Sequence, residues 1–297
     1  MELIYRYDPF QPVARQSPAD AAAAIDTLCA GNGRFADFVS LMQQRTLGEH
    51  VESPIVVPVS PLSLGLPIWP GGEVDHAPFA LVLGCADARV PVELIFDQAF
   101  NDLFVIRVAG NVLGVECLGS IDYAVRHLGR SLKLVVVLGH GGCGAVTAAV
   151  DSYLSPTDYS DIAFTHSLRS LVDRIQIAVR GAAKALARVT DGDSPRRSGY
   201  RAALLETAVY LNAAVTSFDL RREIASLGGD PLHVVYGVYD MNSQRIHTLP
   251  LCDSTRRDPT TFAFAGAPDD AGGFARLGDR IAQAVVEAGL LDKCPPR

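Results

Sequence analysis

The hydrophobic residues of this chain gather in short continuous runs, separated by longer stretches with helical spacing. Runs of Val, Leu and Ile with little alternation are typical of strands covered on both faces of a parallel sheet. Four such runs occur, at 79–85 (FALVLGC), 103–109 (LFVIRVA), 132–138 (LKLVVVL) and 232–239 (LHVVYGVY). We therefore predict four strands of a mainly parallel central sheet.

Apolar residues at steps of three and four predict helices between these strands. One helix covers 114–128, a second runs from Leu168 to Leu186, and a third runs from Leu204 to Ile224, with a stop at Gly228–Gly229. Strands that alternate with helices favour an α/β fold in which flanking crossover helices cover the sheet.

Two further features lie at the N-terminal side of this alternation. Residues 17–38 predict a helical arm, with Ser17 as its cap and Pro18 in its first turn. The proline-rich residues 51–78 predict a long surface loop or arm.

The C-terminal residues 250–297 contain a turn-rich stretch and then an amphipathic helix, roughly 273–291. No internal repeat marks a second domain. We expect residues 1–297 to form one domain, with a core at about 20–250 and extensions around it.

Composition narrows the class of protein. Hydrophobic residues make up 48% of the chain and charged residues 20%, as in globular proteins. The net charge of −7 gives no basic field for nucleic acid or an anionic membrane. No apolar stretch approaches the roughly 20 residues of a membrane span, and the first residues lack the pattern of a secretory signal. We predict a cytoplasmic protein.

The six cysteines are too sparse to suggest a disulfide framework. In a reducing compartment they are expected to be core residues, metal ligands or catalytic groups. Cys117 lies on an apolar helical face and is predicted to be a core residue, whereas Cys252 and Cys294 stand in no informative pattern.

Thiol and imidazole groups follow two of the predicted strands. Cys85 ends the run at 79–85, and His140 and Cys143 lie in the GHGGCG stretch that follows the run at 132–138. Open α/β sheets place their sites at the carboxyl ends of strands. Two thiolates and one imidazole suit zinc, and three protein ligands leave a fourth position open, as in catalytic sites. The competing interpretation is that His140 and Cys143 are ordinary turn residues.

Asp87 and Arg89 follow Cys85 at alternate positions in CADAR, so an extended segment turns all three side chains to one side. A carboxylate and a guanidinium here would orient the ligands or the water of a metal site. Alternatively, they form only a local ion pair at a strand end.

The stretch CADARVPVE, followed by GHGGCG, resembles the C-x-D-x-R and H-x-x-C pattern of the β-class carbonic anhydrases. Further stretches, in order along the chain, are similar to the same family: AIDTLCAGNGRFADF (24–38), DLFVIRVAGN (102–111), SIDYAVRHL (120–128) and VVYGVYDMNSQRI (234–246). The resemblance implies an α/β fold, an N-terminal helical arm that embraces a partner, and an obligate dimer with active sites at its interface.

The resemblance also implies zinc-dependent, reversible hydration of carbon dioxide to bicarbonate and a proton by zinc-bound hydroxide. Cys85, His140 and Cys143 are then the zinc ligands. Asp87 accepts a hydrogen bond from the hydroxide, and Arg89 holds Asp87. In some members the aspartate instead ligates zinc in a closed state, which leaves Asp87 as a possible ligand here.

A substrate pocket is implied at positions that match the small apolar cleft of the family, namely Phe104, Ala109, Tyr123 and Gly144; Phe104 and Tyr123 could equally be core aromatics. His76 stands where many members carry a glutamine, and it could bind substrate, move protons or be a loop residue. Members with a closed form often have tryptophan where this chain has Val82, which favours the open form with water on zinc.

Two other functions compete with carbon dioxide hydration. A hydrolase of carbonyl sulfide or carbon disulfide could use the same zinc scaffold, since these linear molecules resemble carbon dioxide. A zinc-binding, non-catalytic assembly protein is the second alternative, because folds often host altered functions. In either enzymatic case we expect a homodimer or a larger homo-oligomer.

Overall fold

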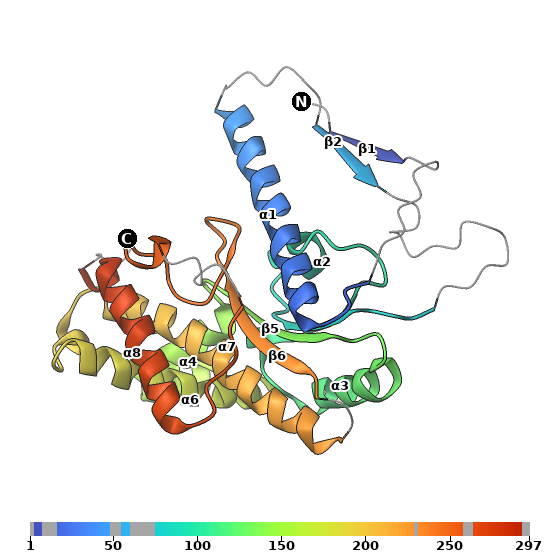
Figure 1. Cartoon of the computed structure of the whole chain (residues 1–297). Helices are drawn as coiled ribbons and strands as arrows, with labels where there is room; N and C mark the ends of the chain where they lie inside the picture. The colour runs from blue at the N-terminus through green and yellow to red at the C-terminus, as the bar shows by residue number, and fades with distance from the viewer. Residues whose placement is uncertain are drawn as a thin grey trace.

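A five-stranded sheet forms the centre of the molecule in the computed structural model, which describes residues 3–7, 17–47, 55–59, 75–228, 231–257 and 264–292. Its strand order is β4-β3-β5-β6-β7. The first four strands are parallel and the short β7 is antiparallel to β6 (Figure 1). The strands are β3 (Ala80–Gly84), β4 (Leu103–Arg107), β5 (Leu134–His140), β6 (His233–Tyr239) and β7 (Ile246–His247). The predicted mainly parallel α/β sheet is confirmed.

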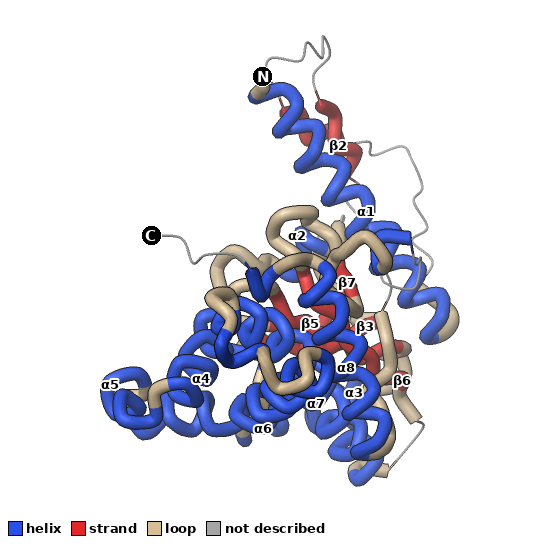
Figure 2. The backbone as a smooth tube through the Cα atoms, turned by 90° about the vertical axis from the view of Figure 1, so that its left-hand side faces the viewer, coloured by secondary structure: helices blue, strands red, loops and turns tan. Residues whose placement is uncertain are grey.

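Helices cover both faces of this sheet (Figures 1 and 2). They are α1 (Ala21–Thr46), α2 (Val92–Ile95), α3 (Val115–Leu128), α4 (Gly144–Leu154), α5 (Tyr159–Ile162), α6 (His166–Val189), α7 (Tyr200–Ser226) and α8 (Ala271–Glu287). The three helices predicted between strands correspond to α3, α6 and α7. Gly228 has a positive φ of 70° just after α7, as expected of a helix stop, while Gly229 lies outside the described residues.

Alternate residues of the central strands pack on opposite faces, which explains the unbroken apolar runs. Leu81 and Leu83 of β3 contribute to the cluster that contains α3, α4, α6, α7 and α8. Ala80 and Val82 contribute to a second, smaller cluster with α1 and α2. Cys117 is buried in the larger cluster, as predicted.

The bounds predicted for the N-terminal helix are wrong at both ends. The helix begins after Asp20, not at Ser17, because the Asp20 carboxylate accepts a hydrogen bond from the Ala23 N–H at 2.9 Å. It also continues to Thr46, beyond the predicted end at residue 38. Asn32 fixes the helix to the body: its amide donates to the Ile95 carbonyl at 3.2 Å and accepts from Ile246 N–H at 3.1 Å.

The prediction of a loop over 51–78 is incomplete. Residues Ile55–Val59 form β2, which pairs in parallel with β1 (Leu3–Tyr7) in a separate two-stranded sheet. Local sequence does not reveal this pairing, because its partner is about fifty residues away in the chain. Most of the remaining residues of 51–78, like Cys294, lie outside the described residues.

The predicted C-terminal helix starts two residues earlier than expected and ends at Glu287, followed by a 3-10 turn at Leu290–Asp292. Asp270 caps it by accepting a hydrogen bond from the Gly273 N–H at 2.6 Å. In the described part of the chain, every helix is too short or too polar to cross a bilayer.

Candidate metal centre

Neighbouring strand ends bring the three predicted ligands together. Cys85 directly follows β3, and His140 is the last residue of the adjacent parallel strand β5. Cys143 occupies the N-cap position of α4, where the chain turns from the sheet into the helix. The carboxyl ends of two parallel strands thus meet at one edge of the sheet, where open α/β folds bind their ligands.

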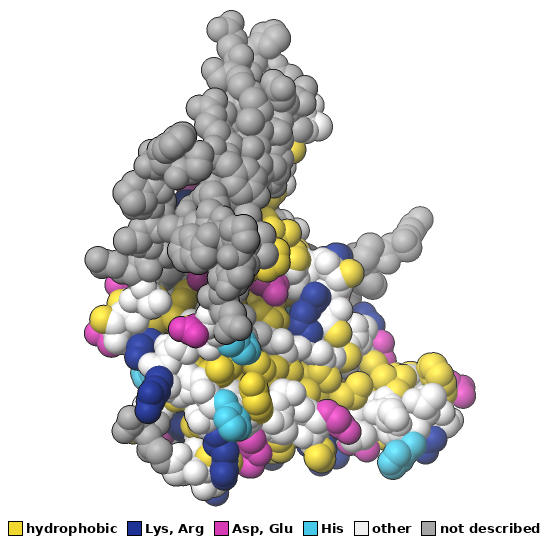
Figure 3. Space-filling model, turned by 90° about the vertical axis from the view of Figure 1, so that its right-hand side faces the viewer, with side chains coloured by type: hydrophobic (Ala, Val, Ile, Leu, Met, Phe, Trp, Pro, Cys, Tyr) yellow, Lys and Arg dark blue, Asp and Glu magenta, His cyan; other side chains and the backbone are white. Residues whose placement is uncertain are grey.

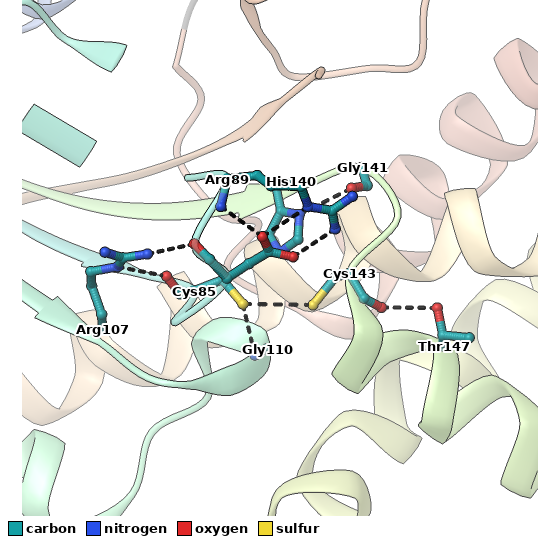
Figure 4. Close-up of polar contacts among 9 residues, drawn as sticks. Cys85, Arg89, Arg107, Gly110, His140, Gly141, Cys143 and Thr147 are labelled. Atoms are coloured by element: carbon teal, nitrogen blue, oxygen red, sulfur yellow. Dashed lines mark hydrogen bonds and ion pairs between the residues drawn. The ribbon is translucent and has the colours of Figure 1, made fainter. Parts of the chain in front are cut away.

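The sulfur atoms of Cys85 and Cys143 lie 3.9 Å apart (Figure 4). Together with a ring nitrogen of His140 they lie within 4.8 Å of one another. All three side chains are buried, with His140 fully so. Across the described residues, no other group of three or more such side chains has this proximity.

The imidazole of His140 is oriented for metal binding. Its Nδ1 lies 3.0 Å from the Gly141 carbonyl oxygen, so Nδ1–H donates and Nε2 is the ring nitrogen that is available to a metal. Nε2 is buried without a hydrogen-bond partner. A buried polar atom without a partner is costly unless a ligand satisfies it. The donor set of two thiols and one imidazole fits zinc with one position left open.

A hydrogen bond joins the two thiols. The hydrogen bond from the Cys143 thiol lowers the pKa of Cys85, outweighing burial, and the Gly110 N–H acts in the same direction. The pKa of Cys143 is raised because its proton is held by Cys85 and because it is buried. Metal binding requires both thiolates, so it must release this proton.

Asp87 lies beside the three ligands and is held by Arg89. The Arg89 side chain donates from Nε to Oδ1 at 3.0 Å and from Nη2 to Oδ2 at 2.7 Å, and its backbone N–H also donates to Oδ1. These bonds hold the pKa of Asp87 well below its usual range. The same Oδ2 atom lies 4.0 Å from His140 Nε2.

Three residues that sequence reasoning missed hold this arrangement in place. Arg107, the last residue of β4, donates to the backbone carbonyls of Cys85 and Asp87 (Figure 4). Gly110 donates its N–H to the Cys85 sulfur at 3.4 Å, and its carbonyl accepts from buried Asn212 at 2.9 Å. No local pattern marks these contacts, because they join segments 20 or more residues apart.

Gly110 has a structural need to be glycine. Its φ of 69° favours glycine, and a Cβ there would lie 2.8 Å from a side-chain atom of Ile175. Because residue 110 has no side chain, its backbone can lie against Ile175 and still bring its N–H to the Cys85 sulfur.

The predicted pocket residues fall into two groups within the chain. Ala109 precedes Gly110 and Gly144 follows Cys143, so both lie beside the centre. His76, Phe104 and Tyr123 form a separate row, with ring centroids 6.0 Å apart for His76–Phe104 and 6.5 Å for Phe104–Tyr123. Phe104 pairs with Leu81 in the register, about 10 Å along the strands from the end that carries Cys85.

An α/β fold with a buried Cys–His–Cys group at its strand ends has a set of side chains that could hold a metal ion. A family model described as carbonic anhydrase matches residues 80–245, which is more than half of the chain. The chain therefore belongs to the carbonic anhydrase family, as its resemblance to the β class indicated.

Several proteins of this family are similar to the chain. It is 49% identical over 94 residues to carbonic anhydrase 2 of Mycobacterium tuberculosis (strain CDC 1551 / Oshkosh), covering 29% of this chain and 44% of that protein. It is 43% identical over 119 residues to carbonic anhydrase of Mycolicibacterium smegmatis, covering 37% and 54%. The chain spans about half the length of the curated relatives it matches, so the activity of the whole protein is a proposal.

Solved structures of β-carbonic anhydrases are also similar to the chain. The Coccomyxa enzyme in complex with acetazolamide is 24% identical, with 57% of this chain and 71% of that chain covered and a TM-score of 0.43. The β-carbonic anhydrase CcaA is 21% identical, with 65% and 85% covered and a TM-score of 0.44.

Proposed function

We propose that this protein is a zinc-dependent carbonic anhydrase that interconverts carbon dioxide with bicarbonate and a proton. The observation that carries the proposal is the buried group of Cys85, His140 and Cys143, with the partnerless Nε2 of His140 facing it. A chain of the carbonic anhydrase family that keeps this ligand set has the means for the reaction.

Cys85, His140 and Cys143 hold the zinc in this proposal. When bound, zinc supplies the Lewis acidity that lowers the pKa of a coordinated water from about 16 to about 7. The Gly110 N–H stabilises the Cys85 thiolate, and the Gly141 carbonyl fixes the His140 tautomer.

Asp87 orients the attacking group by accepting its hydrogen bond. Because the pKa of Asp87 is far below neutrality, the carboxylate is ionised and acts as an acceptor only. Both of its oxygens are bound by Arg89, which favours an arrangement in which Asp87 stays off the metal. Arg89 is a positioning residue in this account.

The substrate pocket is proposed to form between two copies of the chain. In one chain, Ala109 and Gly144 border the centre, while His76, Phe104 and Tyr123 stand apart in their own row. The row borders β4, an edge strand of the sheet, and Tyr123 is half exposed. Hydrophobic side chains flanked by histidines mark this face in Figure 3. A homodimer across it would bring the row of one chain to the centre of the other.

Two alternatives remain as outcomes of the test: hydrolysis of carbonyl sulfide or carbon disulfide at the same centre, and a zinc-binding assembly role without catalysis. The ionised, doubly held Asp87 favours catalysis, because a purely structural zinc site would gain nothing from it. The cytoplasmic location and the single domain stay predictions.

Stopped-flow carbon dioxide hydration on protein of measured zinc content tests the proposal. We expect a rate that rises in proportion to zinc and disappears on chelation. Carbonyl sulfide and carbon disulfide are assayed in parallel. A fully zinc-loaded protein that hydrates no carbon dioxide would refute the proposal, and turnover of a sulfur analogue would then identify the first alternative.

A further inference from the structure

The sulfur atoms of Cys85 and Cys143 face each other across the centre (Figure 4). They lie 3.9 Å apart and are joined by a hydrogen bond. Two sulfurs bound to one zinc ion at about 2.3 Å in tetrahedral geometry lie about 3.8 Å apart, so the spacing suits a shared metal ion. The same spacing leaves the two atoms only about 1.9 Å farther apart than in a disulfide.

This sulfur pair stands alone among the cysteines that the structure describes. No other two of them have their sulfur atoms within hydrogen-bonding distance. Cys252, for example, is a buried free thiol whose neighbours are hydroxyl and carboxylate oxygens. Only Cys85 and Cys143 are therefore placed to react with each other.

Cys85 is the fixed member of the pair. Arg107 donates a hydrogen bond to its carbonyl oxygen at 3.0 Å, and the Gly110 N–H donates to its sulfur at 3.4 Å. The second contact also favours the thiolate form of Cys85, because an N–H group stabilises negative charge on sulfur.

Cys143 is the member with room to move. Glycines flank it at 141, 142 and 144, and a Cβ at any of these positions would meet no other atom within 4 Å. Close packing therefore does not explain these glycines, and only Gly142, with a φ of 63°, has a backbone conformation that favours glycine. Their conformational freedom lets the Cys143 sulfur approach Cys85.

The centre opens to solvent on the side of Asp87 and Arg89. Their side chains are 18% and 63% exposed, respectively, and the Asp87 Oδ2 atom lies 4.0 Å from His140 Nε2. Cys85 and Cys143 are themselves buried. A reagent that reaches the sulfurs must therefore be small, and hydrogen peroxide is little larger than water.

We propose that Cys85 and Cys143 are a redox-sensitive pair, which hydrogen peroxide converts in the metal-free protein to a reversible disulfide that keeps zinc out of the centre. The Cys85 thiolate attacks one peroxide oxygen, the O–O bond breaks, and the hydroxide that leaves takes up a proton, so Cys85 becomes a sulfenic acid. The Cys143 sulfur then attacks the Cys85 sulfur. The S–S bond forms, the S–O bond breaks, and the oxygen leaves as water with the Cys143 proton. Two thiols and one peroxide thus give one disulfide and two waters.

Zinc and the disulfide compete for the same two sulfur atoms. Zinc needs both as thiolates and holds them apart, whereas a disulfide leaves neither as a ligand. Bound zinc therefore protects the pair, and the oxidised pair blocks zinc until a dithiol reduces it by exchange. The inference shares with the proposed function only the assignment of these two cysteines as metal ligands.

Mass spectrometry of the full chain tests the inference. Zinc is removed with a chelator, retention of the fold is checked by circular dichroism, and the protein is treated with hydrogen peroxide at neutral pH before free thiols are alkylated. Cys85 and Cys143 fall in different tryptic peptides, 46–89 and 134–169, so the disulfide appears as a linked pair. We expect this pair, its loss on treatment with dithiothreitol, and recovery of zinc binding only after that reduction. Zinc-loaded protein should form the pair at least about tenfold more slowly.

Two variants sharpen the test. Cys143→Ser should stop at the sulfenic acid of Cys85, which dimedone traps. Cys252→Ser, which changes a buried thiol away from the centre, is the matched control and should form the linked pair as the wild type does. If the metal-free protein does not stay folded, a half-loaded preparation carries the test, because its linked fraction should equal its zinc-free fraction.

The inference is overturned if the folded metal-free protein keeps both thiols free after peroxide, if zinc-loaded protein forms the pair as fast as metal-free protein, or if the oxidised protein still binds zinc. Failure of the proposed function is a separate result, because it is measured as the absence of carbon dioxide hydration by reduced, zinc-loaded protein.

Discussion

Arg107 offers a sharp test of how the fold positions the metal centre, because it touches neither the ligand atoms nor the proposed substrate. Its guanidinium bonds the carbonyl oxygens of Cys85, at 3.0 Å, and of Asp87. It thereby fixes the segment from Cys85 to Asp87, which carries a candidate ligand and the proposed hydrogen-bond acceptor. This segment leads into a turn closed by the Val90 N–H bond to the Asp87 carbonyl, so the predicted extended run from Cys85 to Arg89 is wrong. We predict that Arg107→Gln loosens this segment while zinc stays bound.

The size of the effect follows from the two bonds. Each contributes about 0.5–1.5 kcal/mol net, and the carbonyls left behind can bond to water, so the expected loss of unfolding free energy is about 1–2 kcal/mol. For a chain of this length that corresponds to a fall in Tm of roughly 2–8 °C. Displacement of Asp87 should lower kcat about tenfold, with little change in KM, since Arg107 makes no substrate contact in our account.

Zinc content, thermal unfolding and stopped-flow hydration are measured on the same preparations. Arg107→Lys, which keeps the charge but not the two-pronged geometry, should fall between the wild type and Arg107→Gln. Arg126→Gln, at an exposed position of α3, is the matched control. A normal kcat in Arg107→Gln despite a lower Tm would refute the positioning role, and loss of zinc would show that Arg107 supports the ligands themselves.

Three other predictions concern the centre and a buried histidine. Cys143→Ala should lose zinc and activity together, and its zinc affinity should fall by more than the 10–100-fold typical of mutating a residue that only hydrogen-bonds a ligand. A variant with full zinc content and full rate would contradict the ligand assignment. Asp87→Asn should keep zinc but slow turnover about 100-fold, so an unchanged rate removes Asp87 from the mechanism. Burial lowers the pKa of His247 from 6.5 to about 4, so its stabilising contribution is present above pH 6.5 and is lost as pH falls towards 4. Urea unfolding at pH 7.5 and at pH 5 measures this loss. The unfolding free energy should fall by about 2 kcal/mol more in the wild type than in His247→Asn. Equal falls in the two proteins would contradict the role given to His247.

The sequence was sufficient to predict the sheet and the meeting of the three candidate ligands, because both leave local signals. Unbroken apolar runs mark strands covered on both faces, and a thiol or imidazole directly after such a run lies at the carboxyl edge of a parallel sheet. Cys85 and His140 could therefore be predicted to meet. The first residue of α1 could not be predicted in this way. Ser17 and Asp20 are both acceptable N-caps, and only the hydrogen bond from the Ala23 N–H to the Asp20 carboxylate decides between them.

What escaped prediction depends on contacts between remote segments. Arg107 lies in the DLFVIRVAGN stretch that resembles the family, but its contacts, like those of Asn212, arise only when β4 and α7 are packed beside the centre. The pairing of β1 with β2 is equally non-local. The separation of Phe104 from the centre follows from its place at the amino end of β4, which depends on the strand register.

X-ray absorption at the zinc edge of the purified protein tests the central claim most directly, namely that Cys85, His140 and Cys143 hold zinc and leave one position open. The account predicts two sulfur ligands at about 2.3 Å, one imidazole nitrogen and one light atom at about 2.0–2.1 Å. The spectrum of Asp87→Asn should be the same, because the light atom is not Asp87. A site with one sulfur or none, or a light-atom shell that is lost in Asp87→Asn, would contradict the account.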